Sequence, residues 1–95
     1  MNEVDSRLAK VEKAVGDFGC LVHDFRIENT LTLNDMASLV SISSSYLWRI
    51  ENGKRNPDLD IRVRILTLGM NWSMVDILLY LEQMIAKESA DDKSC

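Results

Sequence analysis

Two helix-start signals that lie only eleven residues apart restrict the fold of this chain more than any other sequence feature. Thr32 and Ser43 each precede a helical apolar pattern, and both residue types cap helix N-termini. Asp35 follows Thr32 by three residues, as in a capping box. The pattern predicts a helix over residues 33–40, joined to the next helix by residues 41–43 alone. Two short helices with so tight a join cannot lie antiparallel, so we expect a helix-turn-helix arrangement.

Four further helices are predicted from caps, glycines and apolar periodicity. Gly53 suits the left-handed position after the helix that Ser43 begins, and Asp58 and Ser73 cap the two helices that follow. Gly16 and Gly19 are expected to loosen the chain between the first two helices. The expected helical ranges are 3–15, 18–29, 33–40, 44–52, 59–68 and 74–87.

Length and composition favour one small helical domain. The chain has 95 residues, with one Pro and four Gly, so an all-α fold is expected. We divide it into an N-terminal amphipathic helix (1–17), a helix-turn-helix domain with a long apolar last helix (18–87), and an acidic flexible tail (88–95). No apolar run reaches the length of a membrane span, and the charged N-terminus lacks a signal-peptide pattern. A cytoplasmic location in a bacterial or phage-infected cell is therefore expected.

The cysteine and histidine content gives no metal-site pattern. Cys20 lies among apolar residues and is interpreted as a small core residue, and Cys95 ends the chain. A disulfide between them is not expected in a reducing cytosol. His23 is the only histidine and has no paired ligand spacing, so we expect it on a helix face and predict no metal and no cofactor.

The charge distribution is uneven. The net charge is −4, which is unfavourable for DNA binding, because phosphate contacts need Lys and Arg. Residues 42–64 nevertheless carry five cationic and three acidic side chains, a balance of +2, whereas residues 65–95 carry two and five, a balance of −3. A basic centre beside an acidic end is compatible with DNA binding and predicts weaker nonspecific binding than a uniformly basic protein would show.

Apolar stripes on the first and last helices suggest two candidate dimer contacts. The N-terminal stripe has heptad spacing; it packs either on its own domain or against a second protomer. The last helix is apolar nearly all round, which implies burial on more than one side, by the N-terminal helix, a second protomer, or both. The candidate dimer residues are Val4, Leu8 and Val11 in the first helix and Leu81, Met84 and Ile85 in the last.

Residues 21–78 resemble the Cro/Xre-type helix-turn-helix family, which includes the lambdoid phage repressors. The most specific match is the ending Ile50-Glu51-Asn52-Gly53-Lys54-Arg55-Asn56-Pro57. The other matching residues are Arg26 and the runs 31–37, 40–43 and 46–49. The resemblance implies a compact five-helix lambda-repressor-like domain, here with an additional N-terminal helix. It also implies that Arg26 and Glu51 form a partly buried structural ion pair.

The outward face of the second motif helix is expected to read base edges. Helical periodicity turns Leu47 and Ile50 inward and leaves a short polar set facing out. An arginine there can bond guanine, and serines can bond several base edges. The candidate base-reading residues are Ser44, Ser45, Trp48, Arg49 and Asn52. Trp48 departs from the family pattern: it could touch DNA, pack under a neighbouring helix, or form part of a protein-binding surface.

A second set of residues is expected to position the phosphate backbone. Thr32 and Ser43 mark helix N-termini, where free N–H groups bind phosphates, and Lys54 and Arg55 follow the recognition helix. Asn56 is a weaker candidate. Arg62 and Arg64 are interpreted mainly as residues of a solvated helix face.

These features predict a sequence-specific transcriptional regulator: a dimeric repressor of a phage, plasmid or mobile-element operon that binds a palindromic operator in double-stranded DNA. The alternative is a helix-turn-helix domain that binds protein, as an antirepressor, an antitoxin or an inhibitor of a nucleic-acid enzyme. An enzymatic function is not expected, because no nucleophile–base pair, phosphate loop or metal spacing is visible. No catalytic residue is predicted.

Overall fold

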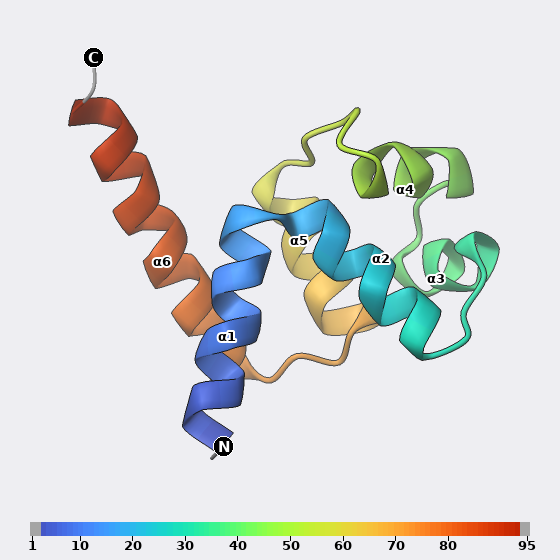
Figure 1. Cartoon of the computed structure of the whole chain (residues 1–95). Coiled ribbons are helices and arrows are strands. Elements are labelled where there is room, and N and C mark those ends of the chain that lie inside the picture. Colours follow the sequence, from blue (N-terminus) through green and yellow to red (C-terminus); the bar gives the residue numbers. More distant parts are fainter. Residues whose placement is uncertain (1–2, 94–95) are drawn as a thin grey trace.

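The computed structural model describes residues 3–93 of the chain, and the side chains of residues 6–87. Every regular element in this part of the chain is a helix (Figure 1). The elements in order are α1 (Glu3–Gly16), α2 (Phe18–Glu28), α3 (Leu33–Val40), α4 (Ser44–Glu51), α5 (Leu59–Arg64), the π-helix η1 (Ile65–Gly69) and α6 (Met74–Lys93). The all-α prediction is confirmed.

The predicted helix starts are confirmed by hydrogen bonds at the caps. The Thr32 hydroxyl accepts from the Asp35 amide while the Asp35 carboxylate accepts from the Thr32 amide, which completes the capping box. Ser43 caps α4 and Asp58 caps α5 through the same type of bond. Gly53 has φ +69°, the left-handed conformation expected after α4. Local capping chemistry therefore determines where these helices begin.

Two helix ends differ from the prediction by more than one residue. The fifth helix does not continue as a regular α-helix to Leu68: it changes at Ile65 into the π-helix η1, in which the Met70 amide donates to the Ile65 carbonyl. The Thr67 hydroxyl donates to the Val63 carbonyl at 2.7 Å and competes for a backbone acceptor, which favours the wider turn. The last helix does not end near Lys87 but extends to Lys93, so most of the segment predicted as a tail is helical.

The N-terminal helix packs on its own domain. Val11 and Ala14 of α1 are fully buried, and α1 lies along α6 and against α2 (Figure 1). They share one core with residues from the other helices, including Leu47 and Ile50 of α4 and Tyr80 of α6. At Val11 the apolar stripe packs on its own domain, the first of the two alternatives, and Leu8 of the same stripe is left partly exposed. Val11 is consequently unavailable as a dimer contact.

A buried carboxylate joins the first turn of α6 to α1. Asp76, in the first turn of α6, is 4% exposed and lies 2.9 Å from Arg7 Nε and 3.0 Å from Lys10 Nζ of α1. It also accepts from the Ser73 amide, while its own amide donates to the Ser73 hydroxyl. Lys10 in turn lies over the Trp72 ring, 5.0 Å from its centre. We call Arg7, Lys10 and Asp76 the α1–α6 clamp.

The α1–α6 clamp predicts a pH-dependent stability. Burial would raise the pKa of Asp76, but the Ser73 amide and Lys10 outweigh it and hold the pKa below its ordinary value of 3.8. Because the pKa of Asp76 is lower in the folded state, its charge stabilises the fold fully above the ordinary pKa of 3.8. This stabilisation is lost as the pH falls from 3.8 through the lowered pKa. Asp76→Asn should therefore cost about 1.5–3 kcal/mol at pH 7 and much less near pH 3, measured by urea unfolding at both. An equal cost at both pH values would mean that the Asp76 charge does not stabilise the fold.

The contact between α2 and α4 depends on Gly19. A Cβ atom at this position would lie 2.4 Å from the Ile50 carbonyl oxygen and 3.2 Å from the Glu51 carbonyl oxygen. Gly19 is therefore a residue inside α2 that lets α4 approach closely, and the expectation that it loosens the chain is wrong. Gly16, the last residue of α1, has open space around its Cα.

Candidate nucleic-acid interface

Helix α4 is anchored on one face and exposed on the other. Leu47 and Ile50 are buried in the core, and the Ser43 hydroxyl accepts from the Tyr46 amide to fix the N-terminus of α4. The opposite face is exposed at Ser45, Trp48, Arg49 and Asn52, whereas Ser44 is half-buried. This is the outward set that the helical periodicity predicts. The structure gives these side chains the access that base reading requires.

The turn between α3 and α4 uses a left-handed serine. Ser41 has φ +63° and ψ +45°, and its amide donates to the Ser38 carbonyl at 3.3 Å. The Arg64 guanidinium donates to the carbonyls of Val40 and Ser41 at 2.7 and 3.3 Å. These hydrogen bonds attach the turn to α5. Residues 41–43 alone connect the two helices, as predicted.

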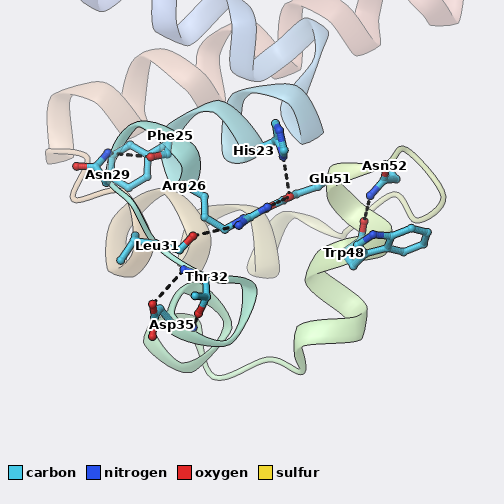
Figure 2. A network of polar contacts seen from close by, with 10 residues as sticks. All are labelled: His23, Phe25, Arg26, Asn29, Leu31, Thr32, Asp35, Trp48, Glu51 and Asn52. Carbon is cyan, nitrogen blue, oxygen red and sulfur yellow. Dashed lines mark hydrogen bonds and ion pairs between the residues drawn. The ribbon is translucent and has the colours of Figure 1, made fainter.

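A buried ion pair joins α2 to the end of α4. Arg26 Nε lies 2.8 Å from Glu51 Oε2, and Arg26 Nη2 lies 3.0 Å from Glu51 Oε1, which makes the pair bidentate (Figure 2). The Glu51 side chain is 2% exposed and that of Arg26 is 13% exposed. Arg26 Nη1 also donates to the Leu31 carbonyl, so one guanidinium links three segments of the motif. The predicted ion pair is confirmed.

These elements match a known domain. A family model described as "Helix-turn-helix domain" matches residues 17–68, just over half of the chain. The chain belongs to this helix-turn-helix family. The family is related to the Cro/Xre-type domains, as the resemblance in sequence indicated. No curated protein and no solved structure matches the chain significantly. A domain of this kind indicates, at a general level, a DNA-binding regulator.

His23 extends the ion pair of the helix-turn-helix domain to the surface. Its Nδ1 atom lies 3.0 Å from Glu51 Oε1, on the same carboxylate that Arg26 contacts (Figure 2). His23 is on an exposed face of α2, as expected, but the sequence did not indicate a partner for it. The signal available was its position three residues before Arg26, which places both side chains near the same face of a helix.

Trp48 lies on the surface of the helix-turn-helix domain. Its side chain is 44% exposed, and Figure 2 shows it directed away from the polar network around Glu51. Asn52 donates to the Trp48 backbone carbonyl at 2.8 Å, which holds Asn52 at the end of α4. Packing of Trp48 under a neighbouring helix is therefore excluded as an interpretation. Contact with DNA and contact with a protein stay open as predictions.

The cationic side chains after α4 differ in whether they donate hydrogen bonds to other described residues. Lys54 is exposed, and Arg55 is exposed with its guanidinium 5.8 Å from the centre of the Tyr46 ring. Arg62 is half-buried: it donates to the Pro57 carbonyl and the Tyr80 hydroxyl, contacts Asn56 Oδ1, and lies over the Phe18 ring. The solvated-face interpretation is wrong for Arg62 and Arg64, because both guanidinium groups bind backbone carbonyls of neighbouring segments.

The two helix N-termini differ as phosphate sites. At Ser43 no carboxylate takes part in the cap. At Thr32 the Asp35 carboxylate is part of the capping box, and its interactions with Thr32, above all the bond from the Thr32 amide, lower the pKa of Asp35 and keep it charged. A fixed negative charge repels a phosphate, so the geometry favours Ser43 over Thr32 as a backbone contact.

The dimer candidates are only partly accessible. Leu8 is 40% exposed and Ile85 is 65% exposed, whereas Leu81 and Met84 are half-buried against the core. The side chain of Val4 and the residue Cys95 lie outside the described parts of the chain. Cys20 is half-buried, with its Sγ 3.7 Å from Asp24 Oδ2. The dimer itself stays a prediction.

No metal site and no membrane-spanning helix is found in the described residues. No group of three or more His, Cys, Asp and Glu side chains between residues 6 and 87 could hold a metal ion. None of the described helices is long and apolar enough to cross a bilayer.

Proposed function

We propose that this protein is a sequence-specific DNA-binding regulator that reads base edges with the outward face of α4. The observation that carries the proposal is the combination on α4 of a rigidly anchored inner face and an exposed outer face. Leu47, Ile50 and Glu51 hold the helix, and the Arg49 guanidinium makes no hydrogen bond or ion pair to any described residue. A helix held in this way can enter a major groove without losing internal contacts.

The regulator is proposed to be a homodimeric, non-enzymatic repressor of a phage, plasmid or mobile-element operon. Exposed apolar side chains on α6, among them Leu78 and Ile85, support an association between two copies. Two recognition helices related by a twofold axis would meet half-sites of a palindrome about 34 Å apart. Binding over a promoter would exclude the polymerase.

Selection of random duplex DNA by the purified protein tests this function. Arg49→Ala should lose about 1–3 kcal/mol of specific binding and blur the preference at one base pair in each half-site, because a bidentate guanine contact is removed. The measurement is sequencing of the DNA bound by the wild type and by the variant. A uniform loss on all sequences would contradict a base-reading role for Arg49.

Lys54 is the matched test for the phosphate contacts. Lys54→Ala should weaken binding to every DNA sequence alike and lower the slope of log K against log salt concentration by about one, since one fewer counterion is released. The measurement is fluorescence anisotropy with operator and non-operator duplexes at several salt concentrations. An unchanged slope would remove Lys54 from the phosphate contacts.

The exposed Trp48 supports a second candidate function, a helix-turn-helix domain that binds a protein partner. A large aromatic side chain that is 44% exposed is typical of the anchoring residues of protein interfaces. Salt distinguishes the two functions, because binding led by phosphate contacts weakens steeply with salt and apolar protein binding does not. A folded protein that enriches no DNA sequence would favour this second function.

A further inference from the structure

A pocket of about 320 Å³ lies where the end of α1, the start of α2 and the loop after α4 meet. Its wall includes Asp17, Gly53 and Asn56, together with cationic side chains from three separate segments. It lies outside the exposed face of α4, and neither Lys54 nor Arg49 lines it. Its size suits a small polar group or a short stretch of a polymer backbone.

The pocket is positive in a protein that is negative as a whole. Arg55 comes from the loop after α4, Arg62 from α5 and Lys87 from α6, against the single carboxylate of Asp17. The Asp17 carboxylate accepts from the Cys20 amide as the cap of α2, and its charge leaves the lining with a balance of three cations to one anion, or +2. Three cations gathered by folding in a chain of net charge −4 favour an anionic ligand.

Several hydrogen-bond donors around the pocket have N–H groups that no described residue accepts from at short distance. The Arg55 guanidinium contacts only the Tyr46 ring face among the described residues, so its N–H groups are left for a ligand. Lys87 makes one long bond, 3.4 Å, to the Val15 carbonyl at the end of α1. Asn56 presents its Oδ1 to Arg62, which leaves its Nδ2 group as a donor. Arg62 itself is bonded and contributes charge.

We infer that this pocket binds a phosphate group, held by Arg55, Asn56 and Lys87. A planar guanidinium, an ammonium and an amide together supply the charge-assisted donors that a tetrahedral oxyanion accepts. The phosphate has two possible sources: the backbone of the DNA that flanks the operator, or a free phosphate-bearing small molecule. The DNA source rests on the function proposed above, and the small-molecule source does not.

Lys87→Gln tests the inference, with Lys54→Gln as a control that removes the same charge outside the pocket. The first measurement is isothermal titration with inorganic pyrophosphate at constant ionic strength. The small-molecule source predicts saturable binding that Lys87→Gln weakens about tenfold and Lys54→Gln leaves unchanged, since one charge-assisted hydrogen bond is lost. Thermal melting verifies that each variant is folded.

The second measurement is the salt dependence of DNA binding by the same variants. The DNA source predicts that Lys87→Gln lowers the slope by about one although Lys87 lies beyond the family match. Pyrophosphate binding without DNA binding would support the pocket and contradict the proposed function. The inference is overturned if Lys87→Gln equals the wild type in both measurements, or if both variants reduce pyrophosphate binding equally.

Discussion

Glu51→Ala is expected to lower the free energy of unfolding by about 3–5 kcal/mol, because it leaves the guanidinium of Arg26 without its buried partner. Arg26 is only 13% exposed, so water cannot replace the two hydrogen bonds that Glu51 accepts. The melting temperature should fall by about 12 °C or more, since each kcal/mol shifts it by about 4–8 °C in a domain of this size. Thermal unfolding followed by circular dichroism measures the effect.

His23→Ala is the control for Glu51→Ala, since it removes the exposed contact to the same carboxylate and keeps the bidentate pair. It should change the melting temperature far less. If Glu51→Ala melts like the wild type, the ion pair does not stabilise the join between α2 and α4. A double variant, Arg26→Met with Glu51→Leu, should recover part of the lost stability, because an apolar pair of similar volume removes the unpaired charge.

Gly19→Ala is expected to destabilise the protein by about 2 kcal/mol or more. The new methyl group would lie 2.4 Å from the Ile50 carbonyl oxygen, a backbone atom that cannot rotate away. Overpacking of this kind costs about 1–3 kcal/mol and occasionally more, which exceeds the gain of about 1 kcal/mol from replacing a helical glycine with alanine. Because the strain falls on the last turn of α4, specific DNA binding should also weaken.

Gly16→Ala is the matched control for Gly19→Ala, since its Cβ would meet no atom within 4 Å. It should leave stability unchanged or raise it by a few tenths of a kcal/mol. The measurement is the urea midpoint of the two variants and the wild type. Equal midpoints for Gly16→Ala and Gly19→Ala would mean that α2 and α4 are not in close contact.

Local signals in the sequence were sufficient for much of the fold and for the outward face of α4. Thr32, Ser43 and Asp58 cap helices through chemistry that involves neighbours within three residues, and helical periodicity alone separates Leu47 from Arg49. The pair of Arg26 and Glu51 came from the family resemblance, because their separation of 25 residues leaves no local signal.

The features that the sequence did not predict depend on partners far along the chain. Gly19 looks like a helix breaker until the Ile50 carbonyl is placed beside it. Ser73 was predicted to cap the last helix, but the contact of Asp76 in that turn with Lys10 spans 66 residues. Arg62 was assigned to a solvated face, because nothing near it in the sequence indicates that it binds the loop at Pro57 and the hydroxyl of Tyr80.

The residues of the α1–α6 clamp lie outside the family match, so the part of the chain that folds together is longer than the part that the family model covers. Residues 17–68 are what the family has in common, yet the core of this protein is completed by Val11 and Ala14 on one side and by Tyr80 on the other. A fragment cut at the family boundaries would expose the apolar surface that these three side chains cover. Domain swaps, reporter fusions and truncations of this regulator should therefore retain both flanking helices.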